Sequence, residues 1–509
     1  MNDASTVEFD DLQGLLRFGY GKLSGTCFML LDVADADAAR QWLARAPVSN
    51  AVARRPPPET ALQIAFSVEG LRALGVAEEI LEGFSDEFIT GMAGDENRSR
   101  RLGDVARNAP PNWDWGGEPG QVPHMLLLLY AVGKEDLAAR QKTLEDELFS
   151  RAFERRLILP SDDIGMIEPF GFADGISQPE IDWAQRQSTD LHARDNFSNL
   201  VAPGEFVLGY PNEYGMYTAR PLIDPRHDGR AAVLPRAADE PALKDFGRNG
   251  SYLVIRQLHQ DVPGFWQFVD QAVGADPHKR EALAARMVGR ERDGTPLAPR
   301  AARDIPGLSR QKRDNYFTYE LDPRGYRCPI GAHIRRVNPR TGDFPPVVTG
   351  LITRLIKMLG FGQTREDDDL IASTRFHRLL RRGRGYGPLL KPEEAVRPDA
   401  PAAERGLQFI AMAGNILRQF EFVQNAWSMS TTFAGLKQES DPLIGIRQPL
   451  VTGEATANFN RSDPAGPRHQ TCGLPQFVTV RGGGYFFMPG LRALQFIAAA
   501  PAGEGEGRS

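Results

Sequence analysis

Two stretches of the sequence repeat one pattern, and this repeat decides the expected fold. YLVI at residues 252–255 is a short apolar run typical of a strand, and PGFWQFV at residues 263–269 has the apolar spacing of a helix. The same order occurs near the start, where CFMLL at residues 27–31 precedes DAARQWL at residues 37–43. The pattern therefore indicates that the chain restarts near residue 245.

Each half contains a second unit of the same kind. An apolar run at residues 125–130 leads into a helical pattern at 135–148, and a run at 407–412 leads into a helical pattern at 415–427. Strands that alternate with helices are compatible with a parallel sheet or with an antiparallel α+β arrangement, and the spacing alone leaves both open.

The length and composition limit the class of protein. With 509 residues the chain favours two domains or two fused halves. The net charge of -6 argues against nucleic acid as a partner, and no apolar run is long enough to cross a bilayer. Three cysteines without a CxxC pair and an acidic first segment lead us to expect a cytoplasmic protein with no membrane partner.

One histidine stands out among eight. No HxxxH or HxH pair occurs, so a metal site would use a single histidine. His333 lies in CPIGAHIRR at residues 328–336, where small residues before it leave room for a flat ligand. On its own, this pattern is more typical of a surface or hydrogen-bonded core histidine than of a ligand.

Two further motifs carry charged candidates. Asp174 lies between glycines in GFADG at residues 171–175, and Arg381 lies in LLRRGRGYGP at residues 379–388. Glycines let the backbone approach a ligand closely, but each motif alone is also typical of a turn or a solvated basic loop.

Taken in order, the three motifs resemble those of the dye-decolorizing peroxidases. The resemblance covers nearly the whole chain through further motifs, which are DLQG at residues 11–14, QFEF at 419–422, DPLIG at 441–445 and FVTVRGGGYFF at 477–487. It implies an α+β fold of two ferredoxin-like halves, each with a four-stranded antiparallel sheet flanked by helices. We expect an N-terminal domain at residues 1–240 carrying GFADG and a C-terminal haem-binding domain at 241–509, in which haem b is mainly seated.

The resemblance also implies a role for each candidate. His333 would be the axial ligand of the haem iron, and a carboxylate would accept a hydrogen bond from its other ring nitrogen. Asp441 is the expected carboxylate, with Glu421 as the alternative. Asp174 would move a proton between the oxygens of hydrogen peroxide, in mildly acidic solution as well, and Arg381 would stabilise developing negative charge and contact a haem propionate.

The remaining candidates concern access to the haem. Leu407 and Phe409 resemble apolar residues that narrow the space above the haem, so that peroxide enters and a bulky dye does not. Arg340, together with Asn338, resembles residues near the peroxide entrance or the propionates, although an ordinary turn accounts for them equally well.

The resulting interpretation is a haem-dependent peroxidase that reduces hydrogen peroxide and oxidises dyes, phenols or other one-electron donors. The alternative is a non-catalytic haem-binding or carrier protein, which needs the histidine but neither Asp174 nor Arg381. The sequence leaves the choice between a monomer and a homo-oligomer open.

Overall fold

The computed structural model describes residues 7–186, 199–299, 314–341, 373–447 and 456–499. Within these residues, one large antiparallel sheet runs through the molecule in the order β10-β12-β9-β15-β2-β3-β1-β4, with β11 also paired to β12. The strands of its first half are β1 (Gly25–Val33), β2 (Thr60–Phe66), β3 (Met125–Ala131) and β4 (Phe153–Leu159). Those of its second half are β9 (Ser251–Gln260), β10 (Leu380–Arg381), β11 (Arg384–Tyr386), β12 (Gly406–Ala413) and β15 (Val478–Met488).

The two halves repeat one strand order. In each half the first strand lies between the third and the last, and the second strand lies outside the third, which is the order of a ferredoxin-like unit. All pairings within the large sheet are antiparallel. The expected pair of α+β halves is therefore confirmed, and the parallel alternative is wrong.

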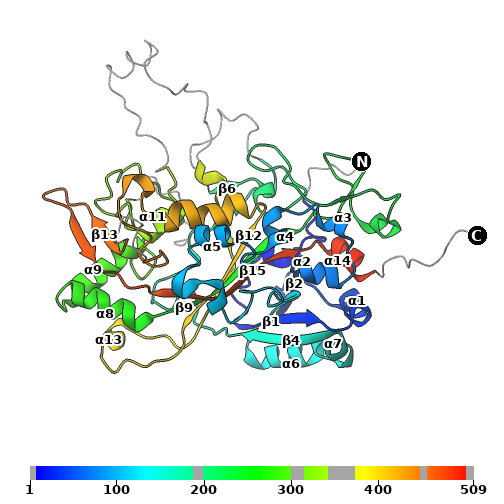
Figure 1. Cartoon of the computed structure of the whole chain (residues 1–509), viewed down its shortest axis with the longest axis horizontal. Helices are drawn as coiled ribbons and strands as arrows, with labels where there is room; N and C mark the ends of the chain where they lie inside the picture. Colours follow the sequence, from blue (N-terminus) through cyan, green and yellow to red (C-terminus); the bar gives the residue numbers. More distant parts are fainter. Residues whose placement is uncertain (1–6, 187–198, 300–313, 342–372, 448–455, 500–509) are drawn as a thin grey trace, which may run out of the picture.

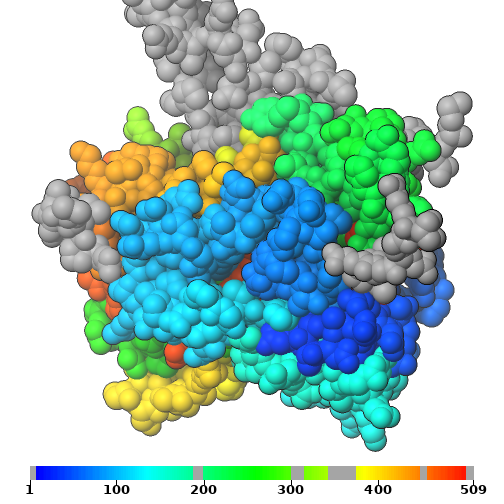
Figure 2. Space-filling model, turned by 45° about the vertical axis from the view of Figure 1, so that its right-hand side comes forward, coloured from blue at the N-terminus to red at the C-terminus, as the bar shows by residue number. Residues whose placement is uncertain are grey.

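The halves join edge to edge. Phe487 of β15 pairs with Phe66 of β2, so the sheet continues from one half into the other. Figure 1 shows β15 and β9 at the centre of the molecule, with β1 and β4 on the side of the N-terminal helices. Figure 2 shows blue and cyan segments of the first half lying directly against orange and yellow segments of the second.

The central strands are apolar throughout because both faces of the sheet are covered. Every residue of β3, MLLLLYA, is buried. Leu127 and Leu129 belong to the core on one face, whereas Leu126 and Leu128 belong to the core on the other. Continuous apolar runs are expected for strands buried on both sides, which is why the sequence pattern could not show their direction.

Helices cover the sheet in both halves. In the first half they are α1 (Ala36–Arg45), α2 (Val68–Ala73), α3 (Glu78–Leu81), α4 (Asp86–Thr90), α5 (Glu96–Leu102), α6 (Lys134–Leu144) and α7 (Glu147–Ala152). In the second half they are α8 (Val262–Ala272), α9 (Pro277–Val288), α11 (His333–Val337), α13 (Pro392–Ala395), α14 (Leu491–Ala498) and two π-helical stretches, Leu417–Glu421 and Val423–Met429. In the described chain, none of the helices is long and apolar enough to span a membrane.

Two helical predictions differ from the structure in detail. The pattern at 135–148 predicts one helix, but α6 ends at Leu144 and α7 begins at Glu147. The Asp146 side chain accepts the N–H of Phe149 and so starts the second helix. The segment predicted as a helix at 415–427 is helical, but Leu417–Glu421 and Val423–Met429 form π-helix instead of α-helix.

Short strand pairs lie outside the large sheet: β5 (Glu180–Ile181) with β6 (Leu200–Val201), β7 (Leu222–Ile223) with β8 (Lys244–Asp245), and β13 (Asn458–Arg461) with β14 (His469–Cys472). The expected domain boundary at residue 240 falls between β7 and β8. That boundary stays a prediction, because the continuous sheet does not separate the halves at a single point. Residues 342–372, most of the long segment between His333 and Arg381, lie outside the described residues.

Candidate active site

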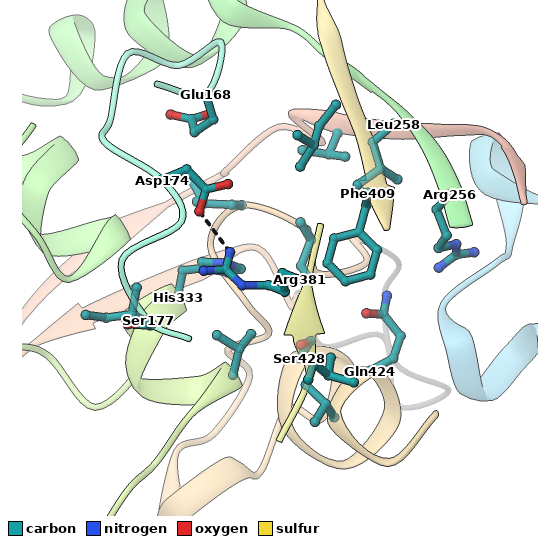
Figure 3. Close-up of a pocket in the computed structure, with 18 of the residues that line it drawn as sticks. Glu168, Asp174, Ser177, Arg256, Leu258, His333, Arg381, Phe409, Gln424 and Ser428 are labelled. Carbon is teal, nitrogen blue, oxygen red and sulfur yellow. Dashed lines mark hydrogen bonds and ion pairs between the residues drawn. The ribbon is translucent and has the colours of Figure 1, made fainter. Parts of the chain in front are cut away.

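A cavity of about 250 Å³ lies on one face of the second half of the sheet. Its walls include His333, Asp174 and Arg381, which the sequence motifs had singled out. Asp174 comes from the loop after β4, His333 from the start of α11, and Arg381 from β10. The cavity thus collects residues from both halves, and Figure 3 shows Asp174 and Arg381 pointing toward each other beside His333.

His333 is held by a buried carboxylate on one side of its ring. Asp441 Oδ2 lies 2.9 Å from His333 Nδ1, and the other oxygen of Asp441 accepts the backbone N–H groups of Leu443 and Ile444. The Asp441 side chain is fully buried, whereas 26% of the His333 side chain is accessible. The accessible part faces the cavity, so the second ring nitrogen is available to a ligand there.

Glu421, the alternative carboxylate, serves another purpose. It pairs with Arg98 of α5 at 2.9 Å and accepts the hydroxyl of Tyr485 on β15 at 3.0 Å. Glu421 therefore ties helices of the two halves to the sheet, and Asp441 is the carboxylate that contacts His333.

The loop before His333 is fixed by a second buried carboxylate. Asp322 accepts the backbone N–H groups of Tyr326, Arg327 and Cys328. Arg335, two residues after His333, donates to the carbonyl oxygens of Asp322 and Cys328. These contacts close the segment into a compact turn, so that His333 can open α11 at the cavity wall.

Asp174 and Arg381, which line the same cavity, form an ion pair. Arg381 Nη1 donates to Asp174 Oδ1 at 2.9 Å. The side chain of Asp174 remains 37% accessible and that of Arg381 31% accessible. Asp174 lies between Gly171 and Gly175, whose φ angles of +96° and +77° are in the left-handed region that favours glycine. The tight loop holds the carboxylate at the cavity rather than inside the protein.

The charges of the site are set by these pairs. Burial raises the pKa of Asp174, but the Arg381 guanidinium and the backbone N–H of Gly175 outweigh it, so the pKa lies below its usual value. Burial lowers the pKa of His333, but the charge and hydrogen bond of Asp441 outweigh it, so the pKa is raised. The cavity therefore presents an ionised carboxylate next to a guanidinium.

An apolar wall closes the space beside this pair. Leu407 and Phe409 are two residues apart on β12 and therefore point to the same face of the sheet, where both line the cavity. Opposite them in register, Leu258 and Arg256 of β9 line the cavity as well. Leu407 and Phe409 thus lie at the site, and their role in narrowing it stays a prediction.

Arg340 is not at the cavity, contrary to the expectation that it contacts the cofactor. Its guanidinium is buried, donates to the carbonyl oxygens of Asn315 and Phe317, and lies 3.9 Å from the centre of the Phe317 ring. The backbone of Arg340 is left-handed, with φ of +58°. Asn338, two residues earlier, does line the cavity.

Sequence reasoning missed Gln178, which holds Arg381 in place. Its amide donates to the carbonyl oxygen of Arg381 and accepts the N–H of Arg381, both at 3.1 Å. Asn315 in turn donates to the carbonyl oxygen of Gln178. The only signal was its position in ISQPE, four residues after Asp174, and a glutamine there has no chemical signature of its own.

The cavity fits a flat, largely apolar group that binds metal through one imidazole. The described residues contain no cluster of three histidine, cysteine or acidic side chains for a free metal ion. Two histidines line the cavity instead. Nδ1 of His377 contacts the carbonyl oxygen of Arg418, whereas His333, backed by Asp441, faces walls formed by apolar side chains such as Val288, Ile334, Val337 and Leu443. This donor set is that of a haem pocket with one histidine ligand.

Comparisons with known proteins agree with this geometry. The chain is 29% identical over 532 residues to a dye-decolorizing peroxidase of the fungus Mycena epipterygia, an alignment that covers 97% of this chain and 88% of the relative. It is 32% identical over 347 residues to the multifunctional dye peroxidase of an Amycolatopsis species, covering 65% and 61%. No protein-family model matches the chain.

Solved structures share the fold. The crystal structure of a dye-decolorizing peroxidase from Auricularia auricula-judae superposes with a TM-score of 0.70 at 24% identity, and covers 97% of this chain and all of the other. A dye-decolorizing peroxidase in complex with 2,6-dimethoxyphenol gives a TM-score of 0.69 with the same coverage.

Proposed function

Because the chain belongs to the dye-decolorizing peroxidase family, we propose that it uses haem b to reduce hydrogen peroxide with electrons from dyes, phenols or other one-electron donors. The observation that carries this proposal is the pairing of Asp174 with Arg381 in the cavity that His333 enters from another wall. A proton-transferring carboxylate and a fixed positive charge are the two groups that cleavage of an O–O bond requires.

We assign the axial contact to His333 and its support to Asp441. The Nδ1–H of His333 donates to Asp441, which leaves Nε2 with a lone pair for the metal. Haem bound there supplies the redox centre at which peroxide is reduced. The negative charge of Asp441 makes the imidazole a stronger electron donor, a common means of favouring peroxide reduction.

Asp174 handles the protons of the reaction. Reduction of hydrogen peroxide to two waters consumes two protons and two electrons, and one oxygen must lose a proton while the other gains one. Ionised Asp174 accepts the first proton and returns it to the leaving oxygen, which departs as water. Arg381 stabilises the negative charge that develops on that oxygen and keeps the carboxylate ionised beforehand.

Leu407 and Phe409 restrict what reaches this pair. Their side chains line the cavity next to Leu258 and leave space for hydrogen peroxide. A bulky dye stays outside the cavity and transfers its electrons from there. The solved complex of a related enzyme with 2,6-dimethoxyphenol supports phenols as a class of donor. The cytoplasmic location expected from the sequence stays a prediction.

The competing function is a haem carrier, and the experiment that separates the two is rapid mixing. Haem-loaded protein is mixed with hydrogen peroxide and its absorbance is followed, and a phenol is then added. A peroxidase shows a fast, saturable spectral change that the phenol reverses with turnover. A haem-loaded protein whose spectrum does not respond to peroxide is a carrier.

A further inference from the structure

The side chain of Glu168 spans the inside of the loop that carries Asp174. Glu168 lines the same cavity, six residues before Asp174, and Figure 3 shows the two carboxyl groups on one segment. One of its oxygens accepts the N–H of Phe172 at 3.0 Å. The other accepts the N–H of Phe170 at 2.9 Å and the side-chain amide of Gln260 at 2.9 Å.

These contacts tie the loop to the central sheet, because Gln260 belongs to β9. Backbone N–H groups that are removed from water need an acceptor, and here one carboxyl group serves two of them. Gln260 adds a third donor from outside the loop. Removing the carboxylate would take the acceptor from two N–H groups of the loop and the tie to β9 at once.

Other contacts hold the loop as well, among them the backbone pairs of Glu168 N–H with the carbonyl oxygen of Phe172 and of Gly171 N–H with the carbonyl oxygen of Glu168. Trp266 donates its indole N–H to the carbonyl oxygen of Phe170, and the N–H of Ala173 donates to the carbonyl oxygen of Arg292. The N–H of Asp174 donates to the carbonyl oxygen of Met166. None of these contacts engages the N–H groups of Phe170 and Phe172, which the Glu168 carboxyl group accepts.

We propose that Glu168 is a positioning residue for the peroxide reaction, whose carboxyl group fixes the loop at residues 171–175 so that Asp174 stays in contact with Arg381. The proposal rests on the proposed function, since Asp174 is the group that handles the protons there. Glu168 does not itself touch the reacting atoms in this scheme. It acts through the loop alone.

The first test measures the loop directly. In haem-loaded Glu168→Gln, hydrogen exchange of the peptide that contains residues 166–175 is expected to be faster at the amides of Phe170 and Phe172. A glutamine of the same size has one acceptor oxygen, and its NH₂ group faces a backbone N–H that it cannot accept. Glu291→Gln, an exposed glutamate on a neighbouring turn, is the matched control and leaves this exchange unchanged.

The second test measures the position of Asp174. The rate constant for peroxide is expected to fall about 10- to 100-fold in Glu168→Gln, because a displacement of about 1 Å has this effect on a reacting pair. Cyanide association is expected to slow with it, since hydrogen cyanide must also give its proton to a base as it binds. Gln260→Leu, which removes only the tie to β9, should shift both rates in the same direction and less strongly.

The outcomes are distinct. Unchanged peroxide and cyanide rates with a lowered melting temperature would show that Glu168 only stabilises the fold, and unchanged exchange at Phe170 and Phe172 would overturn the proposed contacts. A wild-type protein inert to peroxide would contradict the proposed function instead, and cyanide association in the variants would still decide the role of Glu168. If Glu168→Gln does not fold, Gln260→Leu provides the same comparison.

Discussion

Nδ1 of His333 lies 2.9 Å from a carboxylate oxygen of Asp441 that is completely enclosed by protein. Because the carboxylate is an acceptor only, the proton of the neutral imidazole is held on Nδ1 and the lone pair on Nε2 faces the cavity. Two arginines, Arg336 and Arg447, also act on the charge of the buried Asp441. The histidine is therefore prepared for a metal before any cofactor binds.

Replacing the buried carboxylate should weaken cofactor binding. In Asp441→Asn the negative charge and the fixed orientation of the imidazole are lost, and we expect the affinity for haem to fall about 10- to 100-fold. Titration of the haem-free protein with haemin, followed by absorbance, measures this. Asp463→Asn is the matched control, because Asp463 contacts His469 at 3.1 Å in an exposed pair far along the β13–β14 hairpin. Equal affinities for the two variants would contradict the assigned role of Asp441.

Replacing Asp174, the proposed base, should slow the reaction with peroxide while the protein still binds haem. Asp174→Asn keeps the size of the side chain and can still contact Arg381, but it cannot accept a proton at neutral pH. We expect the rate constant for peroxide to fall about 100- to 10,000-fold. Stopped-flow mixing of haem-loaded protein checks this, with Asp163→Asn, an exposed aspartate of the same segment, as the control. A peroxide rate in Asp174→Asn like that of the wild type would rule out Asp174 as the base.

The pH dependence follows from the lowered pKa of Asp174. The reaction needs the ionised carboxylate, so the rate should stay high as the pH falls and decline only below the ordinary aspartate pKa of about 4. The Asp174–Arg381 pair likewise stabilises the fold above the unfolded pKa, and this contribution disappears as the pH falls through the folded pKa. In Arg381→Leu the largest influence that opposes burial is lost and only the weaker ones, such as the Gly175 N–H, remain, so the acid limb should move to higher pH.

The neighbouring arginine is the control for this shift. Arg382 points away from the cavity and donates to the carbonyl oxygens of Leu15 and Leu16. Arg382→Leu should therefore leave the acid limb of the peroxide rate where it is in the wild type. If the acid limb of the peroxide rate lies at the same pH in Arg381→Leu, in Arg382→Leu and in the wild type, Arg381 does not set the pKa of Asp174.

The fold was largely predictable because its signals are local. β1, β3, β9 and β12 follow from apolar runs, and the repeat of strand and helix in both halves follows from their order. The order of the strands in the sheet did not follow, because MLLLLYA in β3 is buried on both faces and contains no alternation. The break between α6 and α7 was missed because it depends on one cap, Asp146.

The site was predictable only where a residue type carries chemistry. Asp174, His333 and Arg381 have a charge or a ligand atom and lie in ordered motifs, and they meet at one cavity. Arg340 also carries a charge in a motif, yet its guanidinium donates to the carbonyl oxygen of Asn315 and does not line the cavity. Glu168 lies more than 200 residues before β10 in the sequence and acquires its role only through the folded loop, which no spacing in the sequence reveals.

Gln178 leads to the remaining prediction, since its amide pairs with both backbone groups of Arg381. Gln178→Leu removes the acceptor of the Arg381 N–H and one of the two donors to the Arg381 carbonyl oxygen, which keeps Arg382 Nη1, and this should lower the free energy of unfolding by about 1–3 kcal/mol. Because β10 then loses a restraint beside Asp174, the peroxide rate should fall as well. Chemical denaturation and stopped-flow mixing measure the two effects, with Gln470→Leu on the exposed strand β14 as the control. A loss of stability with an unchanged peroxide rate would mean that Gln178 supports the strand and not the position of Arg381.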